Sequence, residues 1–344
     1  MKAMMLTGIR KMEMHEMPMP EIIHDTDVLI KMKSIGVCGS DLHYYTTGKI
    51  GTQVVKFPFI LGHEGSGIVI KVGKAVRKIK QGDRVAIDPA MPCGLCSQCK
   101  SGRPHTCYNL KFLGCPGQAN GCLTEYIVMP EKSCIKVSDT INYDQASASE
   151  PLAIGIYAAL QSVPLKNASI GILGFGPIGM SIMLPSIAWG VKKVFVTDKI
   201  NRRLVIAKQA GASWTGNPDN EDIVAEIRQN EPLLLDAVFE CCGKQEALNQ
   251  AVELVKPGGK IIIVGIPEFD NWSLNAHEIR RKEITIQNIR RQNNCTEKAL
   301  EMIEKKEVNI DQMITHHFAF EETPAAFNLV EKYGDGVMKA MICL

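Results

Sequence analysis

A glycine-rich turn at residues 174–179 constrains this chain more than any other feature. Its sequence, Gly174-Phe175-Gly176-Pro177-Ile178-Gly179, follows an apolar run that we expect to be a buried strand and opens a predicted helix. The first glycine permits a tight bend, the second lets the backbone approach a pyrophosphate, and the third lets the helix lie close to the strand. The free N–H groups at the helix N-terminus favour an anion. The spacing predicts a dinucleotide-binding turn.

A carboxylate supports this interpretation. Asp198 ends the next predicted strand, where a carboxylate accepts hydrogen bonds from the adenosine ribose hydroxyls and repels a 2′-phosphate. A simple helix cap is the alternative role for Asp198. Arg202 and Arg203 follow closely and would favour NADP, but Asp198 lies nearer the expected ribose position, so we expect NAD.

The pattern of predicted secondary structure changes after Pro151. Before it, short apolar runs bounded by turn residues predict a small β-rich barrel. After it, predicted strands alternate with predicted helices, which indicates a parallel sheet covered on both faces. The strands expected in the first part lie at 28–33, 67–72 and 84–87. Those expected in the second part lie at 170–173, 194–197, 237–240 and 260–264, with helices at 178–189, 202–210 and 245–255, a turn at 256–259 and a last helix near 297–305.

Bulk composition excludes several classes of protein. A chain of 344 residues favours two domains. The 39 basic and 37 acidic residues give a net charge of +2, so nothing indicates nucleic-acid binding. No signal peptide is recognisable at the N-terminus. Residues 167–191 lack charge, but their five Gly and two Pro suit a strand, turn and helix better than a membrane span. Twelve cysteines without a secretory signal indicate thiols and metal ligands in a reducing cytosol.

Four cysteines at short spacing predict a structural metal site. Cys93, Cys96, Cys99 and Cys107 follow the pattern C-x2-C-x2-C-x7-C in a loop rich in Gly and Pro. Four thiolates can enclose one tetrahedral zinc and leave no open position, so this zinc would be structural. An iron–sulfur cluster and four unrelated thiols are the alternatives.

A second set of candidate ligands is dispersed along the chain. It consists of Cys38, His63, Glu64 and Glu150. One Cys, one His and one or two carboxylates can hold zinc while leaving a place for water or an alcohol. Sequence spacing alone does not bring these residues together.

In order and spacing, these motifs resemble the zinc-containing medium-chain alcohol dehydrogenases over essentially the whole chain. The segments that carry the resemblance are 36–43, 62–64, the four-cysteine loop, Glu150-Pro151 and the glycine-rich turn. Within that family, four segments are most similar to sorbitol (L-iditol 2-) dehydrogenases, namely His43-Tyr44-Tyr45, Gly48-Lys49-Ile50-Gly51, Val54-Val55-Lys56 and Glu150-Pro151-Leu152. The resemblance implies a GroES-like catalytic domain of residues 1–153 and 290–344, and a Rossmann NAD-binding domain of residues 154–289.

The resemblance also implies roles for single residues. Cys38, His63 and Glu64 would bind a catalytic zinc, and Glu150 would be a fourth ligand or hold the zinc-bound water. Ser40 would take the alcohol proton and His43 would relay it to solvent. Substrate contacts are expected at Tyr44, Glu150, Arg290 and Arg291. Contacts with NAD are expected at Gly174, Gly176, Pro177, Ile178, Gly179, Asp198, Arg203, Val264, Gly265, Ile266 and Arg290.

The expected activity is hydride transfer from a secondary alcohol of a sorbitol-, L-iditol- or xylitol-type polyol to NAD, giving a ketose. Two departures leave alternatives open: animal sorbitol dehydrogenases lack the four-cysteine loop, and they carry Tyr where this chain has Arg291. Adjacent cations at Arg290 and Arg291 would suit a sugar acid or a sugar-alcohol phosphate, and butanediol and threonine are further candidates. A non-catalytic zinc- and nucleotide-binding homologue is the alternative of another class. We expect a small-molecule substrate, no nucleic-acid or membrane partner, a cytoplasmic location, and a homotetramer with a homodimer as the alternative.

Overall fold

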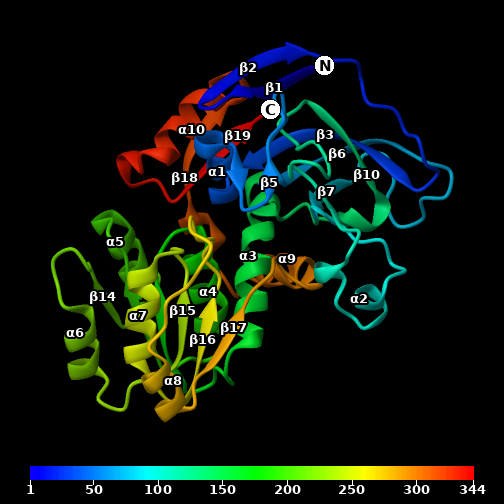
Figure 1. The fold of residues 1–344 in the computed structure, drawn as a ribbon. Helices are drawn as coiled ribbons and strands as arrows, with labels where there is room; N and C mark the ends of the chain where they lie inside the picture. The colour runs from blue at the N-terminus through cyan, green and yellow to red at the C-terminus, as the bar shows by residue number, and fades with distance from the viewer. The chain divides into compact units, whose positions relative to one another are not determined.

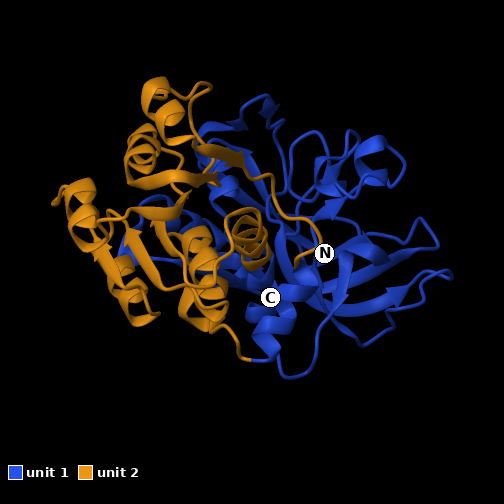
Figure 2. Cartoon of the chain, turned by 90° about the horizontal axis from the view of Figure 1, so that it is seen from below, with its two compact units in different colours: residues 1–150, 296–305, 314–344 blue, residues 151–295, 306–313 orange.

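The computed structural model describes all 344 residues, and the chain divides into two compact units, which Figure 2 colours separately. Unit 1 comprises Met1–Glu150, Thr296–Lys305 and Ile314–Leu344, and unit 2 comprises Pro151–Cys295 and Lys306–Met313. The sequence predicted boundaries at 153/154 and 289/290. In the structure the units divide at 150/151 and 295/296, and Lys306–Met313 belongs to unit 2.

A mixed seven-stranded sheet forms the centre of unit 1. Its strand order is β11-β7-β6-β3-β19-β18, and β10 also pairs with β3. The strands are β3 (Asp27–Gly36), β6 (Glu64–Val72), β7 (Arg84–Ile87), β10 (Tyr126–Pro130), β11 (Cys134–Lys136), β18 (Ile314–Ala319) and β19 (Lys339–Cys343). The three strands predicted in this part of the chain are therefore confirmed. Strands from both ends of the chain meet in this sheet, because β19 pairs antiparallel with β3.

Short ribbons and helices complete unit 1 (Figure 1). Antiparallel pairs are formed by β1 (Lys2–Gly8) with β2 (Lys11–Glu16), β4 (Lys49–Ile50) with β5 (Gln53–Val54), and β8 (Ala90–Met91) with β9 (Lys111–Phe112). The helices are α1 (Gly39–Thr47), α2 (Ser97–Lys100), α9 (Thr296–Glu304) and α10 (Thr323–Glu331). Helix α3 (Tyr143–Gln161) starts in unit 1 and ends in unit 2. The sequence predicted α9, but not α3.

Unit 2 is built on a six-stranded parallel sheet of order β14-β13-β12-β15-β16-β17. The strands are β12 (Ser169–Leu173), β13 (Lys193–Thr197), β14 (Trp214–Gly216), β15 (Leu235–Glu240), β16 (Val255–Ile263) and β17 (Thr285–Asn288). Numbered along the chain, this order is 3-2-1-4-5-6, the order of a doubly wound dinucleotide-binding sheet. The predicted α/β class and the four strands predicted in this part are confirmed.

The helices of unit 2 cover both faces of this sheet. Leu173 lies in an apolar cluster with residues of α6 and α7, whereas the neighbouring Ile172 faces Gly179 of α4. Successive residues of a strand point to opposite faces, so α4 lies opposite α6 and α7. The helices are α4 (Pro177–Ala188), α5 (Asn201–Gln209), α6 (Ile223–Asn230), α7 (Gln245–Leu254) and α8 (Ala276–Lys282). None of the chain's helices has the length and apolar character that a membrane crossing requires.

The residues of the turn predicted at 256–259 lie within the bounds of β16, where they form a bulge in the strand. Pairing moves from Val255 to Lys260 on β16 while the partner strand advances only from Leu235 to Ala237. The intervening residues therefore leave the ladder, and Gly258 adopts a φ of 73°, which favours glycine.

Helix α4 keeps Pro185 in its interior, where the sequence predicted a kink or a weakened helix. Proline has no N–H, so the carbonyl of Ser181, four residues earlier, loses its helical donor. Gly155 of α3 lies against that carbonyl, because a Cβ at Gly155 would stand 2.1 Å from the Ser181 oxygen. The absence of a side chain on Gly155 therefore permits the close contact between α3 and α4.

We predict that Gly155→Ala lowers the free energy of unfolding by about 2 kcal/mol, because the added methyl meets backbone rather than a movable side chain. Alanine stabilises a helix more than glycine does. If the site were open, the substitution would therefore raise the free energy of unfolding instead of lowering it. The matched control is Gly8→Ala, whose Cβ would meet nothing closer than 3.8 Å. Thermal unfolding by circular dichroism measures both. A Gly155→Ala protein as stable as the wild type would contradict the close contact.

Candidate active site and metal centres

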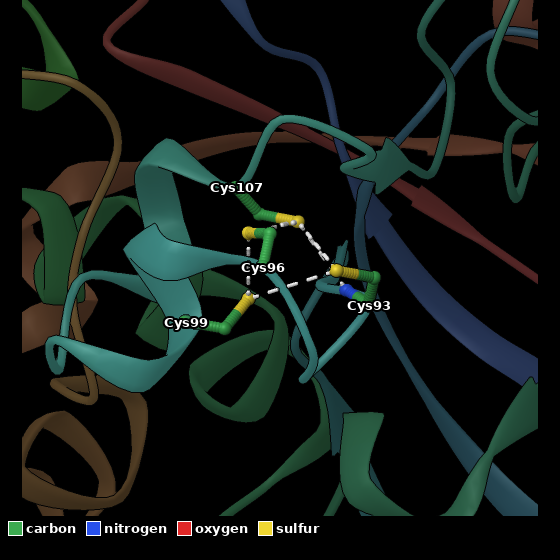
Figure 3. Close-up of side chains that lie close together, drawn as sticks. All are labelled: Cys93, Cys96, Cys99 and Cys107. Atoms are coloured by element: carbon green, nitrogen blue, oxygen red, sulfur yellow. Dashed lines mark hydrogen bonds between the residues drawn. The ribbon is translucent and has the colours of Figure 1, made fainter.

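The four predicted cysteines converge in a loop between β8 and β9 of unit 1 (Figure 3). The sulfur–sulfur distances are 3.4 Å for Cys93–Cys107, 3.6 Å for Cys96–Cys99, 3.8 Å for Cys96–Cys107 and 4.0 Å for Cys93–Cys99. Four sulfurs around one zinc, each about 2.3 Å from the metal, lie about 3.8 Å apart. The geometry suits one tetrahedral ion. An iron–sulfur cluster would need a wider arrangement, because its thiolates bind different iron atoms.

Backbone amides around this loop favour a charged sulfur. Hydrogen bonds from the N–H groups of Cys99 and Tyr108 lower the pKa of the Cys96 thiol to about 6. Burial and the neighbouring thiols raise the pKa of Cys99 to about 12 in the absence of a metal. One thiolate therefore forms readily, and the positive charge of an ion would stabilise the remaining thiolates.

The dispersed candidate ligands Cys38, His63 and Glu64 also come together in unit 1. One ligand atom from each lies within 4.8 Å of the other two. Strand β3 ends at Gly36, and β6 begins at Glu64, which is paired directly with Gly36. Cys38 follows two residues after Gly36 and precedes helix α1, so its thiol lies beside the start of β6. The sheet register brings these ligands together.

Gly36 makes room for the carboxylate of Glu64. A Cβ at Gly36 would lie 2.1 Å from Glu64 Oε2, so the Glu64 side chain lies across the glycine. Any larger residue at position 36 would displace the carboxylate from this cluster.

Asp41 fixes the orientation of this cluster, and the sequence had not indicated a role for it. It is 1% exposed; one oxygen accepts a hydrogen bond from the Gly62 amide at 3.2 Å and lies 3.5 Å from His63 Nδ1. Its other oxygen accepts a 3.3 Å hydrogen bond from the Cys38 amide. Burial lowers the pKa of His63, but the nearby Asp41 carboxylate and Cys38 thiol outweigh burial and raise it well above its usual value. A carboxylate on one nitrogen of a histidine fixes the ring for metal binding through the other nitrogen.

Glu150 lies in α3 with an unsatisfied acceptor. Its side chain is buried, and Oε2 has no hydrogen-bond partner. Burial, with a contribution from the Glu64 charge, raises the pKa of Glu150 to about 7. Helix α3 is attached to β6 by a 2.6 Å hydrogen bond from the Ser147 hydroxyl to the Glu64 carbonyl. A buried orphan oxygen fits a metal ion or its bound water. Cys38, His63 and Glu64 form the group whose ligand atoms lie within 4.8 Å of one another, and Glu150 is not part of that group. The three donors suit a catalytic zinc with an open position.

Lys339 is a second residue that the sequence reading missed. Its Nζ donates to Glu64 Oε1 at 2.7 Å, to Glu64 Oε2 at 2.6 Å and to the Val37 carbonyl at 3.1 Å. Both charged side chains are 1% exposed. The only signal in the sequence was a lysine in an otherwise apolar C-terminal strand.

Helix α1 carries the residues expected to move the proton and contact substrate. Ser40 Oγ lies 3.4 Å from Cys38 Sγ, and His43 follows three residues later on the same face. Tyr44 is buried, and its hydroxyl donates to Gln53 Oε1 at 3.1 Å. Ser40 and His43 therefore lie on the helix that begins directly after the candidate ligand Cys38.

In unit 2 the glycine-rich turn follows β12 with the expected geometry. Gly174 has a φ of 97°, and a Cβ at Gly179 would lie 2.2 Å from the Gly174 carbonyl oxygen. Gly176 precedes α4, whose first residue is Pro177. The tight bend therefore requires Gly174 and the close approach of the helix requires Gly179, whereas a Cβ at Gly176 would meet only Arg203 Nη1, at 3.5 Å.

Asp198 is tied to the turn itself. Its two carboxylate oxygens accept hydrogen bonds from the Phe175 amide at 2.7 Å and the Ile200 amide at 2.8 Å. Arg203 Nη1 lies 3.9 Å from Asp198 Oδ2, and the arginine is 7% exposed. Asp198 is thus more than a helix cap, because it joins the ends of β12 and β13.

The remaining predicted cofactor and substrate residues follow other strands of the same sheet. The amides of Val264 and Gly265, which follow β16, both donate to the Glu240 carbonyl. Ile266 is exposed. Arg290 and Arg291 follow β17, with Arg290 exposed and Arg291 at a φ of 56°. Parallel strands end at one edge, so these segments share an edge with the glycine-rich turn.

Comparison with known proteins identifies the family. Residues 24–139 match the alcohol dehydrogenase GroES-like domain, and residues 177–305 match the zinc-binding dehydrogenase domain. The chain is similar to a sorbitol dehydrogenase from Bacillus subtilis (strain 168), with 36% identity covering 99% of this chain and 97% of that protein. It is 30% identical to an L-idonate 5-dehydrogenase from Vitis vinifera, covering 96% and 92%.

A solved structure has the same fold over nearly all of the chain. It is an Escherichia coli oxidoreductase/dehydrogenase of unknown specificity, with a TM-score of 0.94 and 32% identity, covering 99% of this chain and 98% of that one. The predicted GroES-like and Rossmann classes are therefore confirmed, and the chain is an oxidoreductase that belongs to the zinc-binding alcohol dehydrogenase family.

Proposed function

We propose that the protein oxidises a secondary alcohol of a sorbitol-, L-iditol- or xylitol-type polyol to a ketose and passes the hydride to NAD. The convergence of Cys38, His63 and Glu64 carries this proposal, and the unsatisfied oxygen of the buried Glu150 supports it. The similarity to a sorbitol dehydrogenase supports the choice of a polyol.

Each reacting group has a place in this scheme. When bound, the catalytic zinc lowers the pKa of the alcohol hydroxyl, and NAD accepts the hydride. Ser40 Oγ takes the hydroxyl proton, and the His43 ring relays it to solvent. Glu150 supplies the fourth ligand, a carboxylate oxygen, or holds the zinc-bound water. Tyr44, Glu150 and Arg290 position the remaining hydroxyls of the polyol. The alcohol thus loses one hydride and one proton and becomes a ketone.

Cofactor binding is assigned to unit 2. The pyrophosphate lies on the glycine-rich turn at the N-terminus of α4, where free amides and Arg203 favour an anion. Asp198 accepts hydrogen bonds from the adenosine ribose and repels a 2′-phosphate, which selects NAD over NADP. Ile178 and Val264–Ile266 complete the NAD contacts, and Arg290 contacts the cofactor as well as the substrate.

One observation favours a second class of substrate. Arg290 and Arg291 are two adjacent residues of the chain after β17, and arginine binds carboxylates and phosphates through paired hydrogen bonds. The relative from Vitis vinifera is named for a sugar acid. A sugar acid or sugar-alcohol phosphate is therefore the second candidate. Butanediol and threonine are weaker candidates, because the segment Glu150-Pro151-Leu152 is most similar to polyol dehydrogenases. A non-catalytic role is disfavoured by the presence of Cys38, Ser40, His43 and His63.

We further propose that residues 1–153 and 290–344 act as the zinc domain and residues 154–289 as the NAD domain. The enzyme would work in the cytoplasm as a homotetramer, with a homodimer as the alternative, and without nucleic-acid or membrane partners.

A substrate panel tests this function. NADH absorbance is followed with polyols, sugar acids, sugar phosphates, butanediol and threonine, and zinc is counted in the same preparation. The proposal expects the highest kcat/KM for a polyol and two zinc ions per chain, one for each ligand group. Higher kcat/KM for an anionic sugar would favour the second candidate. No NADH formation with any of them would contradict the dehydrogenase assignment.

Two cysteine variants separate the metal centres. We expect Cys38→Ser to lose one zinc and reduce kcat by roughly a thousandfold or more, since metal catalysis contributes several kcal/mol, while NAD binding by fluorescence titration survives. Cys99→Ser is the matched control in the other centre. It should lose the other zinc and lower the unfolding temperature before it lowers kcat in the molecules that stay folded. Near-normal turnover in Cys38→Ser with one zinc missing would show that the ligand assignment is wrong.

Replacement of Asp198 tests cofactor choice. We expect Asp198→Ala to lower the ratio of kcat/KM with NAD to that with NADP by about 10- to 100-fold, because a hydrogen bond to a charged group contributes about 1.5–3 kcal/mol. Asp236→Ala is the control, because its carboxylate also accepts a strand amide, that of Ser169 at 2.7 Å, in the same unit. An unchanged ratio in Asp198→Ala would contradict the ribose assignment.

A further inference from the structure

The ammonium of Lys339 occupies both oxygens of a residue assigned to the metal. Its three hydrogen bonds, two to Glu64 and one to the Val37 carbonyl, use all the donors that a lysine has. No other lysine of the chain is as buried with a carboxylate partner, since both groups of this pair are 1% exposed. The lysine therefore bridges the segment that leads into Cys38 and the segment that begins β6.

The surrounding backbone holds this bridge in one place. Lys339 is the first residue of β19, and the Val37 amide donates to the carbonyl of the next residue, Ala340, at 3.0 Å. The Glu64 side chain lies over Gly36, where any Cβ would displace it. Both partners are 1% exposed and are carried by strands of the same sheet, so the contact is a built feature of the sheet.

We propose that Lys339 is a positioning residue that competes with the metal for Glu64. While the ammonium holds both carboxylate oxygens, Glu64 gives less charge and fewer bonds to the ion, and a ligand position remains for the substrate. Cys38 and His63 then carry most of the binding. This inference rests on the proposed catalytic zinc, because without that ion the pair would only join strands.

Loss of the Lys339 ammonium affects the metal-free and the metal-bound protein unequally. Removing the ammonium leaves Glu64 buried without a counter-charge, which strongly destabilises the metal-free protein. In the metal-bound protein, the ion supplies the missing positive charge, so this form is destabilised less. The difference appears as tighter metal binding, and a ligand that binds the folded state more tightly raises its unfolding temperature further.

The test compares Lys339→Met with the wild type as zinc-loaded enzymes. Each is equilibrated with a graded series of a zinc chelator, and zinc content and unfolding temperature are measured at every step. We expect the catalytic zinc of Lys339→Met to survive about tenfold more chelator, a change as large as the loss that replacing an ordinary outer-shell partner causes but opposite in sign. Its unfolding temperature should fall more than that of the wild type when the metal is removed. Cobalt absorption should change as Glu64 binds the ion fully, and kcat should fall.

Two further variants keep the test specific. In a Glu64→Gln background, Lys339→Met should no longer shift the chelator curve, because the competition needs the carboxylate. Lys260→Met is the matched control, since Lys260 Nζ donates only to the Gln161 and Ser162 carbonyls in unit 2, and it should leave zinc retention unchanged. If Lys339→Met does not fold, Lys339→Gln removes the charge while keeping a donor and should shift the curve in the same direction.

The outcomes separate this inference from the proposed function. If wild-type protein holds only the four-cysteine zinc, the catalytic zinc and the proposed function fail together. If wild-type protein holds two zinc ions but folded Lys339→Met releases the catalytic one at the same or lower chelator concentration, only the role of Lys339 is overturned. A shift that persists in the Glu64→Gln background also overturns it.

Discussion

The antiparallel pairing of β3 with β6 is the contact on which the metal cluster depends. It sets Gly36 opposite Glu64, and because Cys38 and His63 are each within two residues of this pair, the register alone brings three donor atoms into one small volume. A slip of one residue would turn the Glu64 side chain to the other face of the sheet. The backbone ladder therefore has to form correctly before the side chains have any chemistry to perform.

The same ladder has to accommodate several charges in a dry interior. Asp41, His63, Glu64, Glu150 and Lys339 are all buried, and burying a charge is strongly unfavourable unless it is paired. Asp41 is matched by backbone amides and by His63, and Glu64 is matched by Lys339. Glu150 alone keeps an oxygen without a partner. Among these five buried residues, the oxygen that the protein leaves unsatisfied is the one that a metal or its water would satisfy, so an unfavourable burial in the metal-free protein becomes favourable when the metal binds.

Local sequence spacing predicted the sites that are formed by short segments, and it did not predict those formed by residues far apart in the chain. The glycine-rich turn and the four-cysteine loop are closed by short segments, so their sequence patterns contain their geometry. The dispersed ligands needed family resemblance, because nothing local states that residue 38 meets residue 64. Lys339 was missed since its partner is 275 residues away and its role follows from strand order. Helix α3 was missed because Pro151, which lies inside it, looked like a boundary.

The discontinuity of unit 1 has a consequence for how the protein matures. The four-cysteine loop lies within one short stretch and can close around its ion as soon as that stretch leaves the ribosome. The other centre waits, because the sheet that carries its ligands is completed by β18 and β19, which are synthesised only after Pro151–Cys295 of unit 2, and domains fold largely in the order of their synthesis. The two metals would then be acquired in sequence, with the structural ion entering a nascent chain and the catalytic ion entering a nearly finished one.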